Sequence, residues 1–142
     1  MKTVLLDSSI WISSILKRDV FVENADEIIN FYLNNNFLII LPEIVLFEIL
    51  NVLRRNKVSN IELEKRRRFF NRNSKIKIVK TNVEKLTKTF LNTRESIVMK
   101  SQDCLIAMSY VYFQVDKYET FDHKLLKNLN KLEYEKNNQS SK

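Results

Sequence analysis

Short runs of β-branched and apolar residues recur along the chain and predict buried strands. Residues 3–6 and 37–41 form the clearest of these runs, and residues 76–79 and 118–120 are weaker candidates. Continuous apolar runs of this length are typical of strands that are covered on both faces. Pro42 closes the second run and suits the first position of a following helix, because proline has a fixed φ and no N–H.

The segments between the predicted strands have helical length or helical spacing of apolar residues. Apolar residues at positions 11, 12, 15 and 16 also have this spacing and predict core or dimer surface. Strands that alternate with helices indicate an α/β fold with a parallel sheet that helices cover on both faces. We expect helices over residues 25–33, 44–55, 61–70, 83–90 and 102–113, and a short helix over 123–126.

Composition is consistent with a single globular domain. The chain has 142 residues, of which 44% are hydrophobic and 29% are charged, which are ordinary values for such a domain. We expect the domain to span residues 1–134 and the polar C-terminal tail, 135–142, to fray. Glycine is absent, which excludes the P-loop, the dinucleotide fingerprint and the nucleophile elbow, because each needs glycine at a tight turn or beside phosphate.

The sequence predicts a soluble, cytoplasmic protein with no membrane segment. The longest strongly apolar stretch, 37–41, is far too short to cross a bilayer. Asp7 interrupts the N-terminal apolar run before the core of a signal peptide could form. The single cysteine, Cys104, cannot form an intrachain disulfide, and we expect it to be a small core residue.

The chain is strongly basic. Its 24 Lys and Arg against 17 Asp and Glu give a net charge of +7 and a sequence pI near 9.5. Such a charge attracts polyanions, which makes nucleic acid the leading partner. The total does not show where the charge lies, and many basic proteins bind no nucleic acid.

Glu48 lies in a predicted helix that is otherwise apolar on every side. From residue 44 to 53 only Glu48 and Asn51 are polar, and a helix that is apolar all round is buried. A buried carboxylate needs a compensating cation or several hydrogen-bond donors. An ion pair with Arg55 along the same helix stripe, or exposure at a rim, would be an ordinary structural explanation.

Three aspartates occupy similar places, and each has an ordinary alternative role. Asp7 and Asp122 directly follow predicted strands, so both should lie at the carboxyl edge of the sheet, where open α/β sheets form their sites. Asp103 lies at the start of an apolar helix that Ser101 could cap. The helix dipole favours a negatively charged side chain in this first turn. Asp122 could instead begin the short helix after it, and Asp7 could be a turn residue.

The coincidence of four such acids in a basic chain indicates a cation site. Clustered carboxylates repel one another and raise one another's pKa unless a cation lies among them. Carboxylate oxygens select hard ions, so we expect Mg²⁺ or Mn²⁺. The chain's only histidine, His123, and its only cysteine argue against a zinc site built from these two residue types.

The residues around these acids match a known pattern over nearly the whole chain. The matching pieces are VLLDSSI at residues 4–10, LPE at 41–43 leading to EILNVL at 48–53, QDCLIA at 102–107, and TFD at 120–122. Each piece alone is weakly specific, but their order and spacing together are fairly specific. The chain resembles the PIN domain family and, within it, the VapC-type toxins of toxin–antitoxin pairs.

The resemblance implies a fold, a site and partners. It implies a PIN-like three-layer α/β/α sandwich with a mostly parallel central sheet, in which Asp7, Glu48, Asp103 and Asp122 bind one or two divalent ions. The small polar residues Ser9 and Thr120 would support that site, and we place Asn51 in the same supporting role. It also implies a homodimer, which is frequent in the family, and a VapB-like antitoxin whose C-terminal segment blocks the site. The absence of glycine, and Cys104 where small residues are common, depart from the pattern and put the subfamily in doubt.

The function we expect is metal-dependent hydrolysis of RNA phosphodiester bonds by an endoribonuclease, with the four acids as its catalytic residues. Cations must hold the substrate because four acids alone repel RNA, and the densest basic stretches supply the candidates Arg54, Arg55, Arg66 and Arg67.

Other functions remain open. A housekeeping RNA-processing nuclease or a DNA-directed nuclease would use the same acids, and a catalytically silent nucleic-acid-binding module is a third possibility, although such modules are expected to lose some acids. A phosphatase of the haloacid dehalogenase type needs a second acid where Ser9 stands, so we exclude it.

Overall fold

The computed structural model describes the backbone of residues 1–140 and the side chains of residues 1–133. Its centre is a four-stranded parallel sheet with the strand order β3-β2-β1-β4. Each predicted strand is present, which confirms the α/β class. The strands are β1 (Lys2–Leu6), β2 (Phe37–Pro42), β3 (Ile76–Val79) and β4 (Lys117–Glu119).

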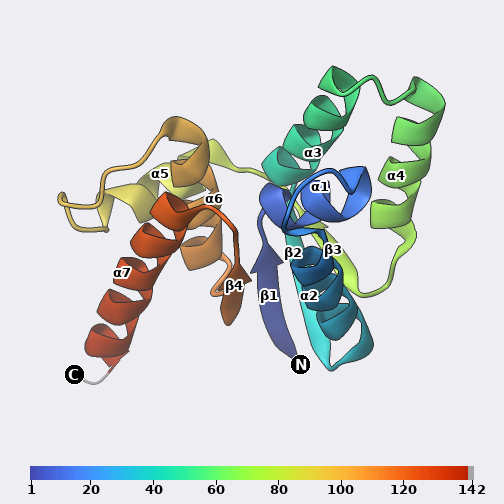
Figure 1. The fold of residues 1–142 in the computed structure, drawn as a ribbon. Helices are drawn as coiled ribbons and strands as arrows, with labels where there is room; N and C mark the ends of the chain where they lie inside the picture. Colours follow the sequence, from blue (N-terminus) through green and yellow to red (C-terminus); the bar gives the residue numbers. More distant parts are fainter. Residues whose placement is uncertain (141–142) are drawn as a thin grey trace.

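The helices cover the sheet on both sides, as Figure 1 shows: α5, α6 and α7 lie on one side and α1 to α4 on the other. The chain steps from β1 to β2 to β3 in one direction and then returns to β4 beyond β1, so right-handed crossovers place the later helices on the opposite face. The result is the three-layer sandwich. The helices are α1 (Ser8–Leu16), α2 (Val22–Asn34), α3 (Glu43–Arg55), α4 (Asn60–Arg72), α5 (Val83–Leu91), α6 (Ser101–Tyr112) and α7 (His123–Ser140).

The central strands place two loops side by side at one edge of the sheet. In the register of β1 and β4, Leu6 lies opposite Glu119, and the N–H of Asp7 donates to the Glu119 carbonyl at 3.0 Å. Asp7 and Thr120 therefore leave neighbouring strands at the same carboxyl edge. Leu5 and Leu6 are buried in the core, so the start of this edge is held rigidly.

Three sequence-based boundaries are wrong. Pro42 is the last residue of β2 and the N-cap of α3, because its ψ of 140° is extended and the helix begins one residue later. Lys100, not Ser101, is the N-cap of α6. The last helix runs to Ser140 rather than ending at residue 126, since Leu125, Leu129 and Leu132 at helical spacing pack into the core.

Two further expectations concern the ends of the molecule and the membrane. The fraying of the tail at 135–142 stays a prediction, because α7 is continuous to Ser140 and residues 141–142 lie outside the described residues. Within the part of the chain that is described, no helix is both long enough and apolar enough to span a membrane.

Candidate active site

Asp7 is the buried centre of the carboxyl edge. Its side chain is only 5% exposed and follows β1 directly. The Ser9 hydroxyl donates to Asp7 Oδ2 at 3.0 Å, and the Thr120 hydroxyl donates to the same oxygen at 2.9 Å. A hydroxyl from the first turn of α1 and one from the loop after β4 therefore hold the carboxylate in one orientation.

The same two hydroxyls connect the loop after β1 with the loop after β4. Ser9 Oγ accepts a hydrogen bond from the N–H of Phe121 at 3.1 Å. Thr120 Oγ1 accepts one from the N–H of Asp122 at 3.0 Å. Each hydroxyl thus donates to Asp7 and accepts from an N–H of the loop after β4, which ties the position of Asp122 to that of Asp7.

Glu48 projects toward this edge from α3, between the buried residues Val45 and Ile49. Its Oε2 atom is buried and has no hydrogen-bond partner. Burial raises the pKa of Glu48, the negative charges of Asp7 and Asp103 raise it further, and the polar groups of Ser8 and Gln102 oppose the rise. Among the described residues no ion pair joins Glu48 to Arg55, so this explanation of the buried acid is not realised.

Asp103 lies in the first turn of α6, as the sequence predicts, and is half-buried. Burial raises its pKa, and the charges of Asp122 and Asp7 add to the rise, while nearby Lys100 opposes it. Asp103 therefore connects the other acids, because its charge interacts with those of Asp7, Asp122 and Glu48.

Asp122 combines a structural role with a place in the cluster. It is exposed, and its Oδ1 atom accepts hydrogen bonds from the N–H groups of Lys124 at 2.9 Å and Leu125 at 3.2 Å. These bonds cap the start of α7. The capping role considered from the sequence is therefore present, and Oδ2 remains for another partner beside Asp103.

The four acids have the chemistry of a cation site but do not yet surround one point. No three of the described His, Cys, Asp or Glu side chains lie close enough together to form a ready-made metal site. The donor set is all carboxylate, two of its pKa values are raised, and the buried Oε2 of Glu48 is unpaired. These features fit a hard divalent cation that would draw the side chains together.

The other residues singled out from the sequence lie on α3 and α4. Asn51, Arg54 and Arg67 line a cavity of about 320 Å³ between α3 and α4. In the described structure Asn51 makes no hydrogen bond to the acids, and its supporting role stays a prediction. Arg55 is exposed and Arg66 half-buried on these same two helices.

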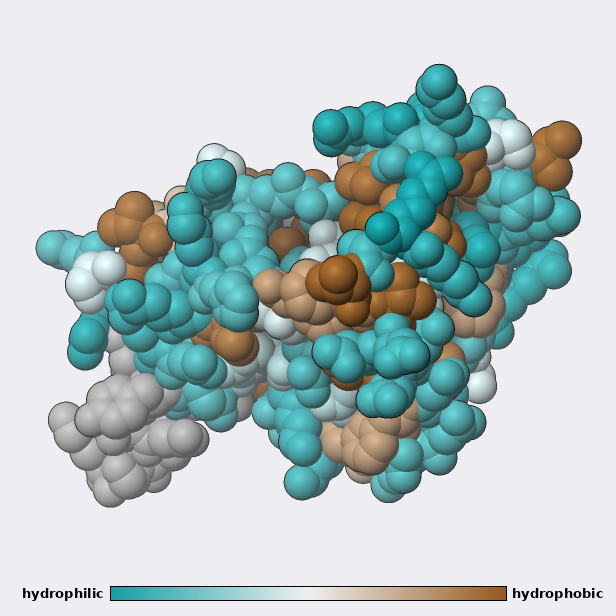
Figure 2. Space-filling model, viewed as in Figure 1, coloured by the Kyte–Doolittle hydropathy of each residue, from teal (hydrophilic) through white to brown (hydrophobic). Residues whose placement is uncertain are grey.

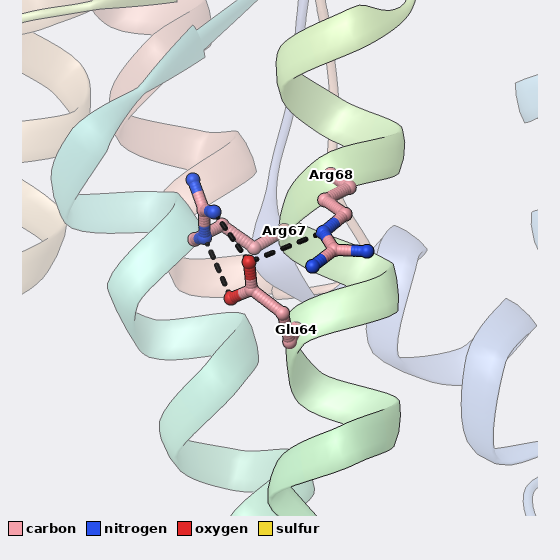
Figure 3. Close-up of polar contacts among 3 residues, drawn as sticks. All are labelled: Glu64, Arg67 and Arg68. Atoms are coloured by element: carbon pink, nitrogen blue, oxygen red, sulfur yellow. Dashed lines mark hydrogen bonds and ion pairs between the residues drawn. The ribbon is translucent and has the colours of Figure 1, made fainter.

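An ion-pair cluster on α4 occupies part of this basic stretch. Arg67 donates to Glu64 through Nε at 2.9 Å and Nη2 at 2.5 Å, and Arg68 donates to it through Nε at 3.3 Å (Figure 3). Hydrogen bonding from Arg67, followed by its charge and the contact of Arg68, lowers the pKa of Glu64 to about 2. The guanidinium of Arg67 is thus already engaged within its own helix.

Sequence reasoning missed three polar neighbours of the acids. Ser8 Oγ lies 3.5 Å from Asp7 Oδ1 and also influences Glu48. Gln102 acts on Glu48, and Lys100 supplies a positive charge near Asp103. All three are sequence neighbours of the predicted acids, so attention to the adjacent positions could have found them.

Comparisons with known proteins identify the family and the fold of the chain. The family model of the PIN domain matches residues 4–132. No match was found among proteins of curated function. Among solved structures, the chain is similar to VapC20 of Mycobacterium tuberculosis, a toxin that cleaves the sarcin–ricin loop, with a TM-score of 0.67 and 12% identity over 86% of this chain and 92% of that one. It is also similar to VapBC2 of Rickettsia felis, solved with a DNA fragment from its promoter, with a TM-score of 0.64 and 18% identity over 89% and 95% of the two chains.

Proposed function

The chain belongs to the PIN domain family, and on this basis we propose that it is a metal-dependent endoribonuclease, the toxin of a VapBC-type pair. VapC20, which shares the fold, is a toxin that cleaves the sarcin–ricin loop. VapBC2, which also shares it, supports a VapB-like antitoxin as the partner. A homodimer and a cytoplasmic location belong to the same proposal.

The single observation that carries the proposal is the electrostatic interaction among four acids, of which Glu48 forms no ion pair within the described residues. Asp7, Asp103 and Asp122 come from three separate segments, and Glu48 brings a buried oxygen with no partner. Holding uncompensated carboxylates together costs free energy. A fold that retains such a cluster has a use for a cation there.

Asp7, Glu48, Asp103 and Asp122 would hold Mg²⁺ or Mn²⁺, which when bound activates water and neutralises charge on the phosphate. Ser9 and Thr120 fix the orientation of Asp7 through the hydrogen bonds to Oδ2. Glu48, whose Oε2 has no protein donor, is placed to bind the ion or to orient the attacking water. Because Asp7 is held in one orientation, the cation would need to draw in mainly the other three carboxylates.

RNA as the substrate is supported by the charge of the chain and by one cation at the site. The net charge of +7 attracts a polyanion. Lys100 lies near Asp103 at the start of α6, where an ammonium group can contact a phosphate oxygen. Arg54, Arg55 and Arg66 remain candidates for more distant phosphates, with Arg67 partly occupied by Glu64.

The decisive experiment is cleavage of RNA by the purified protein with Mg²⁺ or Mn²⁺ and with EDTA. We expect cleavage that EDTA abolishes, with 5′-phosphate and 3′-hydroxyl products. Asp7→Asn should reduce the rate by about 10²-fold or more, because it removes charge at the centre of the site. Asp26→Asn is the control, because Asp26 is a half-buried aspartate on α2 that, like Asp7, accepts a hydrogen bond from a hydroxyl, here that of Ser14 on α1.

Several results would contradict the proposal. Full cleavage in EDTA, or full activity of Asp7→Asn, would rule out the metal-dependent mechanism. Cleavage of single-stranded DNA at the same rate as RNA would point to the DNA-directed alternative. Binding of RNA without cleavage under any divalent ion would point to the silent binding module.

A further inference from the structure

Two phenylalanine rings from distant parts of the chain stack beside the acids. Phe21, in the loop between α1 and α2, lies on Phe121, between β4 and α7, with ring centroids 4.7 Å apart and planes 19° apart. Phe121 is held by its N–H, which donates to Ser9 Oγ, and Ser9 donates to Asp7. Two hydrogen bonds therefore connect this stack to the centre of the site, and Asp122 is the next residue in the chain.

The two rings differ in what covers them. Phe121 is half-buried and packs against the core, whereas Phe21 is 41% exposed. Val20, next to it, is 89% exposed. Figure 2 shows a hydrophobic patch at the centre of the view, over the region where Figure 1 places the end of β1 and helix α1. Phe21 is thus the solvent-exposed ring of the stack, and Phe121 beneath it is held by the core.

The loop that carries Phe21 is itself fastened. The N–H of Phe21 donates to Asp19 Oδ1 at 2.9 Å, and Asp19 Oδ2 accepts from the Ser13 hydroxyl on α1 at 2.8 Å. An exposed aromatic ring on a fixed backbone loses little conformational entropy when a flat ligand stacks on it. This is the arrangement of stacking platforms that bind single-stranded nucleic acid.

We propose that Phe21 binds a nucleobase of the RNA near the cleaved phosphodiester by extending the stack with Phe121. The inference rests on the proposed function and adds to it a residue that positions the substrate, which requires that the stacked base be unpaired. The base occupies the exposed face of Phe21, and the adjoining phosphate lies over the acids near Lys100. Phe21 is a positioning residue, because it holds the nucleotide and takes no part in the bond changes.

The test compares RNA oligonucleotides that carry one abasic nucleotide at successive positions around the mapped cleavage site. For the wild-type protein, one position should raise KM by roughly 5- to 100-fold, the range expected from one base–aromatic stack. Phe21→Ala should raise KM for intact RNA by a similar factor with kcat little changed, and should no longer distinguish the abasic RNA. Phe21→Trp should restore the distinction, because indole also stacks.

Phe31→Ala is the matched control. Phe31 is 49% exposed on α2, and its ring contacts those of Tyr32 and Phe37, which is the first residue of β2. It should leave KM unchanged on every RNA. If Phe21→Ala still distinguishes the abasic position, or if Phe21→Trp restores nothing, Phe21 only joins two loops and the inference is wrong.

A binding measurement separates this inference from the proposed function. RNA labelled with 2-aminopurine at the same position should lose fluorescence when wild-type protein stacks on the base, and this quenching needs no cleavage. Phe21→Ala should bind without the quenching. A wild-type protein that cleaves no RNA contradicts the proposed function, whereas equal quenching by wild type and Phe21→Ala contradicts the stacking inference.

Discussion

Two glutamates on neighbouring helices show how differently the same side chain is used in this fold. On α4, Arg67 and Arg68 donate to Glu64, and these contacts lower its pKa to about 2. On α3, burial and the charges of Asp7 and Asp103 raise the pKa of Glu48. The first acid is satisfied by cations of its own helix, and the second has none.

The comparison separates charge density from chemical function. The arginines of α4 form the densest basic stretch of the chain, yet Arg67 and Arg68 are engaged with Glu64 on an exposed surface, where ion pairs contribute little to stability. Glu48 lies among apolar neighbours with a buried, unpaired oxygen. The buried carboxylate of Glu48, which has no cationic partner, therefore indicates the active site better than the many arginines of α4 do.

The largest effect that follows from the comparison is on cleavage. Glu48→Gln should lower the rate of RNA hydrolysis by about 10²-fold, because it removes one negative ligand from the cation site while keeping the size of the side chain. Glu64→Gln, the same substitution on the neighbouring helix, should leave the rate unchanged. The rates are measured with saturating Mn²⁺ on one RNA oligonucleotide. Equal losses in both variants would show that the acids differ in environment but not in function.

A second, smaller effect concerns stabilisation by the ion. A ligand at 100 times its Kd stabilises the folded protein by about 2.7 kcal/mol, which corresponds to a rise in Tm of roughly 5–10 °C for a chain of this size. We expect Mg²⁺ or Mn²⁺ to produce such a rise in the wild type and in Glu64→Gln. Glu48→Gln should lose most of it in differential scanning calorimetry. The same rise in Glu48→Gln would place the ion away from Glu48.

The sheet and the carboxyl edge were predictable from the chain because apolar runs end abruptly at acids. Asp7 follows the first run and Asp122 the last, and parallel strands bring such ends together. Glu48 stands out because its helix is otherwise apolar. The fold is confirmed. Electrostatic interactions connect Glu48 with Asp7 and Asp103, and Asp103 with Asp122, whereas a shared metal site and the catalytic roles of these acids stay predictions.

Other features depend on contacts that no local pattern encodes. The stack of Phe21 on Phe121 joins residues 100 positions apart, and either ring alone reads as ordinary core. The direction of Asn51, into the cavity between α3 and α4, depends on how α4 packs against α3. The pairing of Arg67 with Glu64 follows helical spacing of three residues, so this loss of a free arginine was open to prediction.

The smallest effect is on the stability of the metal-free protein, and its sign distinguishes the two glutamates. The pKa of Glu48 is raised in the folded state, so the folded protein binds more protons than the unfolded chain between the two values. In EDTA, the free energy of unfolding should therefore increase as the pH falls from 7.5 toward 4.5, the ordinary pKa of a glutamate. Glu48→Gln should raise Tm at pH 7.5 by a few degrees, about 3 °C per kcal/mol, and flatten this pH dependence.

The pKa of Glu64 is lowered from 4.5 to about 2, so its stabilising contribution is lost only below that window, and Glu64→Gln should leave the slope between pH 7.5 and 5.5 intact. A Glu48→Gln protein that melts lower than the wild type in EDTA would show that the Glu48 carboxylate is already compensated within the fold, and the comparison would then no longer support a site that awaits a cation.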